Sequence, residues 1–308
     1  MKLFSVEKPG VYTTFQDLGR TGYLKYGVPA SGALDRFALQ VGNILVGNQR
    51  NTVGLEITMQ GPELVAEVDC VIAITGADLS PMINGERIHM WKSQTIRKGQ
   101  VLEFGRPNVG VRAYLTVNGG FEAEEYMGSK SVYEPAGLGR KLEAGDELNG
   151  NPQNQITGIG LFHTEIPAYG REVEVRVIKG PHDHKLSSDV LEQFFTTPHE
   201  VSPQSNRMGY RLVSDGIKTD HEGDIISDAV PLGGIQLPAN GEPIILLADR
   251  QTTGGYTRIG TVIGPDLPLI AQMPPGGTIR FKEISVEEAQ ELAIDQERIF
   301  RIWERIVR

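Results

Sequence analysis

Residues 244–263, IILLADRQTTGGYTRIGTVI, set two apolar runs on either side of a polar segment. The runs 244–248 and 259–263 have the composition of β-strands. A hairpin connection needs only two or three residues, whereas the segment between these runs is longer and chemically varied. It contains an acid, a base, an amide, two hydroxyls, a glycine pair and a tyrosine, namely Asp249, Arg250, Gln251, Thr252, Thr253, Gly254, Gly255 and Tyr256.

Two interpretations of this segment follow from its chemistry. A glycine pair lets the backbone approach a ligand closely. Hydrogen-bond donors and acceptors to a small polar molecule would then come from Asp249, Gln251, Thr252, Thr253 and Tyr256. We therefore predict a hairpin whose loop binds substrate. The alternative is a structural hairpin in which the polar groups are buried anchors.

Strand-like segments continue through the rest of the chain. In the first half they are LEITMQG, ELVAEV, CVIAITG, VLEFG and VRAYLTVNGG, and the second half opens with VEVRVIKG. Apolar residues alternate in several of these segments, as expected for strands with one buried face. The 37 glycines, about 12% of the chain against an average of about 7%, indicate many tight turns. The sequence therefore predicts a mainly β fold with a few helices.

Three segments have the periodicity of helices. The first is about 33–46, with Ser31 as its predicted cap, and the second is about 188–195. Ser285 and Glu288 form a capping box that begins a C-terminal helix. The apolar residues expected to pack that helix onto the rest of the protein are Ala289, Leu292, Ala293, Ile299, Ile302, Trp303 and Ile306.

The length of the chain and two linker-like segments in its middle predict two domains. A chain of 308 residues is long for a single core. The polar segment NGNPQNQ at 149–155 and the segment IPAYG at 166–170 interrupt the middle of the chain. We therefore predict domains at 1–168 and 169–308.

Composition excludes several classes of protein. The formal charge is −9 and no cluster of basic residues stands out, which argues against nucleic-acid binding. No apolar run approaches the roughly 18 residues of a membrane-spanning helix, and the N-terminal segment lacks an apolar signal core. We expect a cytoplasmic protein. The single cysteine, Cys70, lies in an apolar strand and is expected to be a buried thiol.

The common cofactor motifs are absent from the sequence. Residues 128–131, GSKS, contain the residue types of a phosphate-binding loop without its spacing. His182 and His184 have no third ligand near them in the sequence, so no metal site is predicted. There is no Met-Lys-Met tract that could carry biotin, and no Rossmann fingerprint.

Two segments outside 244–263 could bind an anion. Gln16, Asp17 and Arg20 lie in a glycine-rich segment that leads to Ser31 at the predicted helix start, where unpaired amides suit a carboxylate or phosphate. Asp35 follows in the first turn and is the candidate catalytic acid or base. A purely structural cap and loop is the alternative for these residues.

The segment SNRMGYRL at 205–212 contains Asn206, Arg207 and Arg211. Residues four apart in a strand share a face, so both guanidinium groups would converge on one anion. A solvated strand edge is the alternative.

Long stretches of this sequence resemble a known family. They are TFQDLGRTGYLKYGVPASGALDR, RAYLTVNGG, SNRMGYRL, GGIQLPANGEPIILLADRQTTGGYTRIGTVI and DLPLIAQMPPGGTIRF. In order and nearly over the whole chain, they are similar to the allophanate hydrolase subunit 2 family, the A/B part of biotin-dependent carboxyltransferases. The resemblance implies two β-barrel-like domains, the second cyclophilin-like. It also extends the candidate substrate-binding groups back to Gln236.

The resemblance implies a subunit that works with partners. Stand-alone members of the family act in prokaryotic 5-oxoprolinases, which open 5-oxo-L-proline to L-glutamate with ATP. The implied partners are a subunit-1-type protein carrying the carboxyltransferase C/D part and a LamB-type subunit. ATP would be used with these partners, and no biotin would be attached to this chain.

Three other functions remain open from the sequence. One is the carboxyltransferase half of an enzyme of the urea carboxylase type. Another is a regulatory protein that sequesters an inhibitor of a sporulation kinase. A cyclophilin-type prolyl isomerase follows from fold analogy alone.

Overall fold

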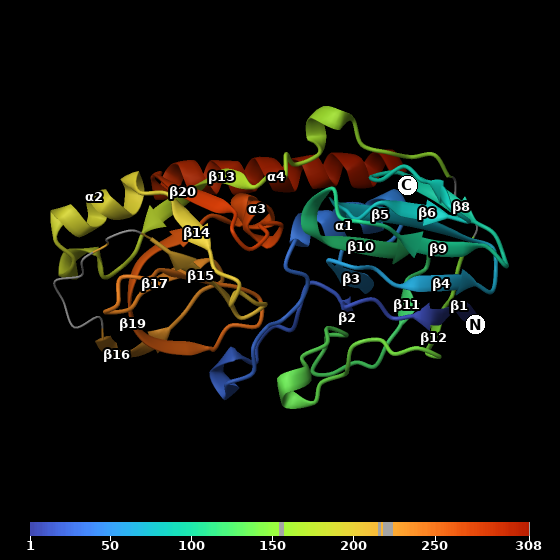
Figure 1. Ribbon diagram of the computed structural model, residues 1–308, viewed down its shortest axis with the longest axis horizontal. Helices are drawn as coiled ribbons and strands as arrows, with labels where there is room; N and C mark the ends of the chain where they lie inside the picture. The colour runs from blue at the N-terminus through green and yellow to red at the C-terminus, as the bar shows by residue number, and fades with distance from the viewer. Residues whose placement is uncertain (154–156, 215–216, 218–223, 308) are drawn as a thin grey trace. The chain divides into compact units, whose positions relative to one another are not determined.

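The structure, a computed structural model, describes residues 1–153, 157–214, 217 and 224–307 (Figure 1). It divides into two compact units, each built from more than one segment. The first contains Met1–Arg20, Ser31–Tyr169 and Arg298–Arg308, and the second contains Thr21–Ala30 and Gly170–Glu297. The sequence assigned residues 21–30 and 298–308 differently, because it treated each domain as continuous. Asn154 and Gln155 of the predicted linker lie outside the described residues.

The first unit contains two antiparallel sheets. One sheet has the order β11 (Phe121–Glu122), β12 (Glu147–Gly150), β1 (Lys2–Lys8), β4 (Glu63–Ala66), β9 (Val101–Phe104), β6 (Pro81–Ile83) and β7 (Glu86–Arg87). The other has the order β2 (Tyr12–Gln16), β3 (Gly54–Thr58), β10 (Val109–Val117), β5 (Cys70–Asp78) and β8 (Ser93–Ile96). The strands expected from the apolar segments of the first half are confirmed.

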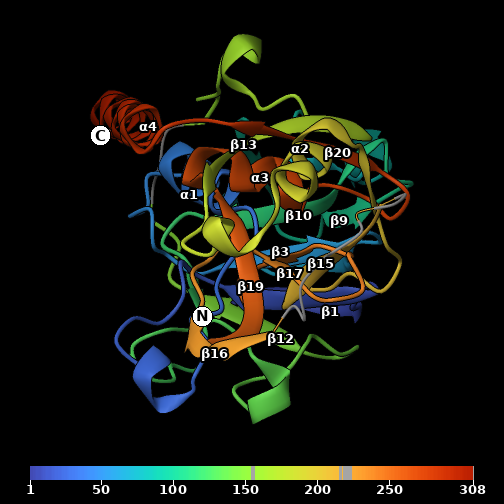
Figure 2. The same ribbon diagram turned by 90° about the vertical axis from the view of Figure 1, so that its left-hand side faces the viewer.

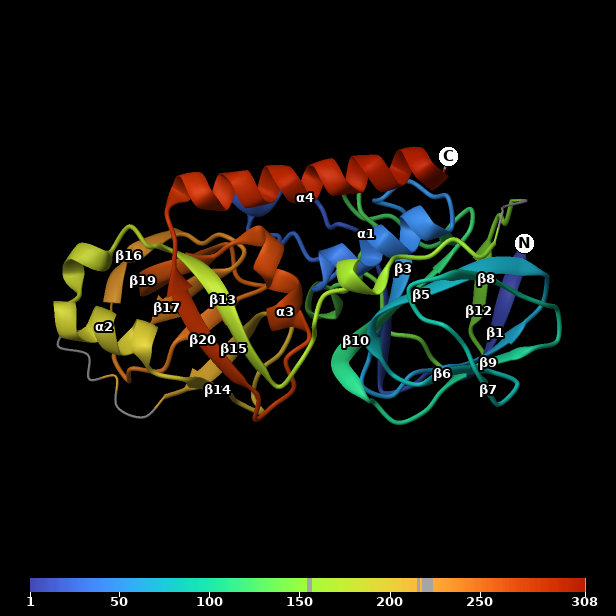
Figure 3. The ribbon, with the colours of Figure 1, turned by 90° about the horizontal axis from the view of Figure 1, so that it is seen from above.

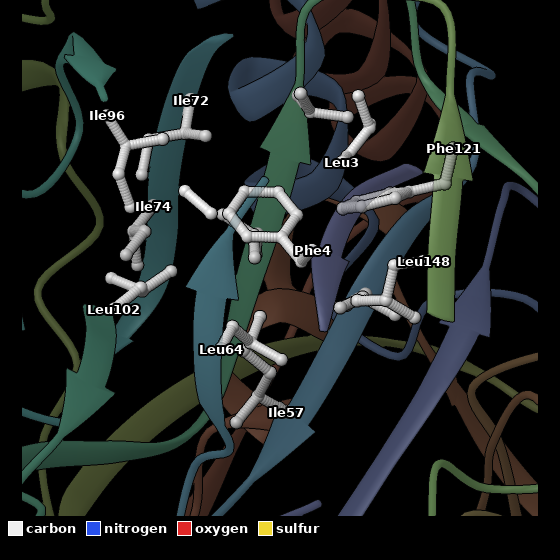
Figure 4. Close-up of a cluster of buried hydrophobic side chains, with 14 of the residues drawn as sticks. Leu3, Phe4, Ile57, Leu64, Ile72, Ile74, Ile96, Leu102, Phe121 and Leu148 are labelled. Atoms are coloured by element: carbon white, nitrogen blue, oxygen red, sulfur yellow. The ribbon is translucent and has the colours of Figure 1, made fainter. Parts of the chain in front are cut away.

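The core of the first unit lies between these sheets (Figure 4). Phe4 and Leu64 of one sheet belong to the same buried cluster as Ile57 and Ile72 of the other. Burying a side chain of this size contributes about 1.5–3 kcal/mol, so the cluster holds the two sheets together. Cys70 is part of it, and burial raises the pKa of its thiol to about 12. The predicted buried thiol is confirmed.

Helix α1 (Arg36–Leu45) covers the second sheet of the first unit. It packs against β5 and β10, which are therefore buried on both faces (Figure 3). The residue that caps the helix is Asp35, whose carboxylate accepts the Ala38 N–H at 2.8 Å. The prediction of Ser31 as the cap is wrong, because a cap must immediately precede the first helical residue.

The second unit is a β-barrel. Its strands have the order β13 (Glu172–Lys179), β20 (Thr278–Glu283), β14 (His199–Val201), β15 (Gly209–Val213), β18 (Ile244–Leu246), β17 (Gly234–Leu237), β19 (Thr253–Val262) and β16 (Asp224–Ala229). A further pairing of β13 with β19 closes seven of these strands into a ring, and β16 extends from β19 (Figure 2). Closure removes exposed strand edges. The predicted mainly β fold with barrel-like domains is confirmed.

The segment 244–263 is not a hairpin. Strand β17 lies between β18 and β19 in the sheet, so the two apolar runs are not paired with each other. Strand β19 also begins earlier than expected, at Thr253, and pairs there with β16. Gly254, Gly255 and Tyr256 are therefore strand residues, and the connection is limited to 247–252. The loop prediction failed because the glycine pair was assigned to a loop that approaches a ligand, whereas these residues lie in a paired strand.

The remaining helical segments are short, apart from the C-terminal helix α4. They are α2 (Ser188–Thr196), α3 (Leu267–Ala271), α4 (Val286–Val307) and the single turns η1 (Leu24–Tyr26), η2 (Glu134–Ala136), η3 (His163–Glu165), η4 (Asp183–Lys185) and η5 (Gly264–Asp266). The predicted helix at 188–195 is confirmed as α2. No helix in the described part of the chain is long and apolar enough to cross a membrane.

The predicted capping box of α4 is confirmed. Ser285 Oγ accepts the Glu288 N–H at 3.1 Å, and the Glu288 carboxylate accepts the Ser285 N–H at 2.9 Å. The predicted apolar face is partly wrong. In the last turns, Phe300, Trp303 and Val307 pack into the cluster around α1, whereas other apolar residues of the predicted face are exposed: Ala293, Ile299, Ile302 and Ile306. Residues 300, 303 and 307 share one face at helical spacing.

His199 in β14 predicts a pH dependence for the barrel. Its ring lies between Ser214 Oγ at 2.6 Å from Nδ1 and the Phe194 carbonyl at 2.8 Å from Nε2. Burial lowers the pKa of His199, although the hydrogen bond to Phe194 opposes this shift. The folded barrel therefore favours the neutral ring. This contribution to stability is complete above the unfolded pKa of about 6.5 and is lost as the pH falls through the lower folded value.

We expect the barrel to melt at a lower temperature at pH 5 than at pH 7.5. In His199→Gln, the melting temperature should depend less steeply on pH. Calorimetric scans across this range would measure it. His89→Gln, at an exposed histidine of the first unit, is the control and should keep the wild-type slope. Equal slopes in wild type and His199→Gln would contradict the prediction.

Candidate functional site

Asp17 is the centre of a buried polar cluster in the first unit. It follows β2, is 4% exposed and accepts four hydrogen bonds. Oδ1 accepts from the Gly19 N–H at 2.7 Å, from Ser129 Oγ at 2.7 Å and from Ser131 Oγ at 2.6 Å. Oδ2 accepts from the Lys130 N–H at 2.8 Å. Asp17 therefore fixes two loops to each other.

Gln16 and Arg20 join the same two loops. The Arg20 guanidinium donates to the Ser131 carbonyl and, at 3.5 Å, to the Tyr126 carbonyl. The Gln16 amide donates to the Val132 carbonyl at 3.3 Å. Both side chains are buried, at 0% and 2% exposure. The predicted residues Gln16, Asp17 and Arg20 are thus brought together, and their contacts are to the protein itself.

The segment 128–131 is the partner that the sequence did not identify. Its residue types were noticed only as an incomplete phosphate loop. In the structure the Lys130 N–H and both serine hydroxyls are used by Asp17, so they are not available to a phosphate. The segment therefore does not form a phosphate-binding loop. The pairing could not be read from the sequence because more than 110 residues separate Asp17 from Ser129.

A hollow of about 260 Å³ lies beside this cluster. Asp17, Ser129 and Lys130 line one part of it, and Asn51 and Thr52 line another. Asn51 Oδ1 accepts the Leu18 N–H at 2.9 Å, which ties this wall of the hollow to the loop that follows β2. Asp17 is the residue of the predicted segment 16–20 that lines this hollow.

Ser31 lies close to the same loop. It is 3% exposed with a left-handed φ of 54°, and Gly32 follows with a φ of 90°. A Cβ at Gly32 would lie 2.7 Å from the Gly19 nitrogen, so only glycine permits this approach of the two backbones. The structure therefore places Ser31 beside the segment 16–20 through this close approach of two glycines, and not at a helix start.

Asp35 has a structural position. It is 0% exposed, and besides capping α1 its Oδ2 accepts the Tyr169 hydroxyl at 2.7 Å. Its N–H donates to the Tyr114 hydroxyl at 2.8 Å. Burial raises the pKa of Tyr169 well above its usual range, and the Asp35 carboxylate adds to this shift. Tyr169 therefore stays protonated and donates to Asp35. A catalytic role for Asp35 remains a prediction, and these contacts favour a capping role instead.

In the second unit, Arg207 and Asp249 form a buried ion pair. Arg207 Nε lies 2.8 Å from Asp249 Oδ2, and Nη2 lies 3.3 Å from Oδ1. The two residues are 8% and 7% exposed. Arg207 precedes β15, whereas Arg211 lies within it with an exposed side chain. The predicted convergence of Arg207 and Arg211 on one strand face is wrong, because only Arg211 is in the strand.

The other predicted residues of the second unit separate into buried and exposed groups. Arg250 Nε donates to the Val230 carbonyl at 2.9 Å, and both Arg250 and Asp249 act as internal anchors. The side chains of Asn206, Gln251 and Thr253 are exposed, Thr252 is half-buried, and Tyr256 is 41% exposed. The segment thus combines both interpretations that the sequence left open, with buried anchors first and exposed polar groups after them.

Gln236 explains one of the glycines in β19. It is 1% exposed, and a Cβ at Gly254 would lie 2.3 Å from its Nε2 atom. Glycine is therefore required there so that the amide can lie against the strand. Within the described part of the chain, this Nε2 group has no hydrogen-bond partner.

His182 and His184 do not form a metal site in the described residues. His182 Nδ1 accepts the Arg258 N–H at 3.2 Å, and burial, with Arg258 nearby, lowers the pKa of its ring. No group of three histidine, cysteine or acidic residues in the part of the chain that the structure describes lies close enough to hold a metal ion.

Comparisons with known proteins agree with this fold. Residues 26–283 match the family described as carboxyltransferase domain, subdomain A and B. The C subunit of the 5-oxoprolinase of Escherichia coli is 36% identical over 304 residues, which is 97% of this chain and 96% of that protein. The protein of the same name from Haemophilus influenzae is 35% identical over 91% of this chain and 90% of its own length.

A solved structure has the same fold as this chain. The urea amidolyase of K. lactis matches 98% of this chain with a TM-score of 0.91 and 30% identity. This chain spans only 20% of that larger protein. From the match over residues 26–283 and the identity to relatives of the same length, the chain belongs to the carboxyltransferase subdomain A and B family.

Proposed function

We propose that this chain is the C subunit of an ATP-dependent 5-oxoprolinase, which opens 5-oxo-L-proline to L-glutamate. The observation that supports this most is the 36% identity to a protein of that name over nearly the full length of both chains. The proposed partners are a subunit-1-type protein with the carboxyltransferase C/D part and a LamB-type subunit. A cytoplasmic location belongs to the same proposal.

The chemistry requires a substrate site with several kinds of contact. An amide in a lactam is stabilised by resonance, so opening the ring needs activation. Transfer of a phosphoryl group from ATP to the amide oxygen would activate the ring carbon for addition of water. The C–N bond would then break with a proton going to the nitrogen, and hydrolysis of the resulting acyl phosphate would release phosphate and glutamate. Because the segment 128–131 of this chain does not fit a phosphate, we assign the nucleotide to the partner subunits. This chain would then bind and orient the lactam.

In this proposal the exposed and the buried polar groups of the second unit have different roles. Gln251, Thr252, Thr253 and Tyr256, with Asn206 and Arg211, reach the surface fully or in part and would contact the activated substrate only in the assembled enzyme. Buried groups would hold their backbone in place, as the Arg207–Asp249 pair does for the start of the connection after β18.

We expect the purified chain alone to be catalytically silent. The candidate groups among the described residues include few that could act as acid or base, and the segment 128–131 is not free for a nucleotide. An incomplete site also leaves water free to enter. The measurement is ATP-dependent formation of glutamate from 5-oxoproline by the chain alone and by the chain with its subunit-1-type and LamB-type partners.

The assay has informative outcomes in each arm. Turnover by the full set and none by the chain alone is the expected result. Turnover by the chain alone would refute the dependence on partners. If the full set is inactive with 5-oxoproline and instead acts on urea with a biotinyl donor, the carboxyltransferase function replaces the proposed one.

That second function has its own support. The match to the K. lactis urea amidolyase has a TM-score of 0.91, and the urea carboxylase of Kluyveromyces lactis matches equally well over 98% of this chain. Since this chain spans 29% of the urea carboxylase, a urea-directed activity would need the remaining parts from other proteins.

A further inference from the structure

The hollow beside Asp17 contains a cation without a counter-ion. Lys130 is half-buried and lines the hollow, and its ammonium has no ion-pair or hydrogen-bond partner among the described residues. Its backbone N–H is held by Asp17 at 2.8 Å, and Ser129 and Ser131 on either side are held by the same carboxylate. The backbone that carries this ammonium is therefore fixed in advance, which lowers the cost of binding an anion.

The other walls of the hollow add neutral donors. Asn51 uses its Oδ1 on Leu18, which leaves its Nδ2 group as a donor. Thr52 also lines the hollow, and the N–H of Gly128 has no backbone partner among the described residues. The carboxylates of the lining are Asp17, whose oxygens are already hydrogen-bonded, and the exposed Glu125, which can accept a hydrogen bond from a ligand.

Lys130 also lines a second hollow, which is less suited to an anion. It is lined by Glu124, Asp146 and Glu147, and its arginine, Arg140, is already paired with Asp146 at 2.7 Å. An anion there would face three carboxylates. The charge distribution therefore favours the hollow beside Asp17.

We infer that this hollow binds a small monocarboxylate that also carries an amide N–H, with the Lys130 ammonium on its carboxylate and Glu125 available to its N–H. The volume of about 260 Å³ is below the range of roughly 300–1,000 Å³ of sites for drug-sized ligands, which suits a small molecule. If the proposed function is correct, on which this identification of the ligand rests, the molecule is 5-oxo-L-proline.

The test is binding to the full chain without ATP or partners. The wild-type chain is titrated with 5-oxo-L-proline, with 2-pyrrolidinone, which lacks the carboxylate, and with inorganic phosphate, while the amide resonances of Asn51, Thr52 and Gly128 are followed by NMR. We expect 5-oxo-L-proline to shift these resonances and the other two compounds to bind at least about tenfold more weakly, the scale of one charge-assisted contact.

Variants assign the contact to the ammonium. Lys130→Gln keeps the backbone N–H that Asp17 needs, so the cluster should stay folded while affinity falls by about tenfold. Lys130→Arg should restore most of the affinity. Lys98→Gln, at an exposed lysine that lines neither of these hollows, is the matched control and should bind like wild type.

The outcomes separate this inference from the proposed function. Unchanged binding in Lys130→Gln, resonance shifts elsewhere, or tighter binding of phosphate than of 5-oxo-L-proline would overturn the inference, whatever the assembled enzyme does. Carboxylate-dependent binding that requires Lys130 would support it even if the full set of subunits does not turn over 5-oxoproline, and in that case only the proposed function would fail.

Discussion

Replacing Asp249 with alanine is expected to destabilise the barrel of the second unit by about 3–5 kcal/mol. The substitution leaves the Arg207 guanidinium, 8% exposed, without the carboxylate that lies 2.8 Å from it. The cost of a buried charge without its partner exceeds that of any single neutral hydrogen bond. Hydrogen exchange of the backbone amides at positions 247 and 249, which donate to the carbonyls of Met208 and Arg207, would measure the loss locally.

Two controls separate burial from charge. Asp146→Ala removes a pair with Arg140 that is 54% exposed on the arginine side, and should cost less than about 1 kcal/mol. The double variant Arg207→Met with Asp249→Leu removes both charges and should recover much of the stability. A loss as large in the double variant as in Asp249→Ala would show that the pair acts through its shape rather than its charge.

The ion pair also changes what a substitution at Arg207 means for activity. The sequence suggests an anion-binding arginine, whose loss would lower the activity of the assembled enzyme directly. In the structure Arg207 is an internal partner of Asp249, so Arg207→Ala should lower activity mainly through the stability of the barrel. Arg211, exposed on β15, is the arginine of this segment that is placed to meet a ligand.

Asp17→Ala is the second large effect, and it concerns the first unit. The four donors that Asp17 satisfies would lose their acceptor in a buried site. At about 1–1.5 kcal/mol for each of the four hydrogen bonds, the expected loss is about 4–6 kcal/mol. The loops 16–20 and 126–132 should then separate, and binding to Lys130 should be lost with them.

The two tryptophans make this loss measurable. Trp91 and Trp303 both belong to the first unit, so urea unfolding followed by tryptophan fluorescence reports that unit. Asp69→Ala is the control, since it removes one hydrogen bond that the Lys98 N–H donates to an exposed carboxylate. If the urea midpoint of unfolding falls no further in Asp17→Ala than in Asp69→Ala, the serines and amides around Asp17 must find other hydrogen-bond partners.

Local patterns predicted the secondary structure well where they were strong. The alternation in 111–117 and the capping box at Ser285 and Glu288 each depend on neighbours in the sequence, so they could be read directly. The hairpin at 244–263 could not, because β17, which comes earlier in the chain, inserts between its two strands. A turn signal cannot show which strand will lie beside which.

The candidate sites show the same limit more sharply. The residue types at Asp17, Arg207 and Asp249 indicate polar chemistry, and the sequence identified the segments that contain them. It could not tell a group that faces a ligand from one that is satisfied inside the protein, since burial depends on distant segments. Ser129 and Lys130 acquire their importance only when the fold places them against Asp17.

The sequence by itself determined the mainly β class, most of the strands and helices, the buried Cys70 and the family resemblance, because each rests on a local pattern or on the order of motifs. Only the tertiary structure decided that β17 separates the two strands of segment 244–263, that Asp17 holds Ser129 and Lys130, and that Arg207 pairs with Asp249. The physical reason is that a charge or a donor in a folded protein is defined by its nearest partner. For these groups the partner comes from another part of the chain, which no local pattern specifies.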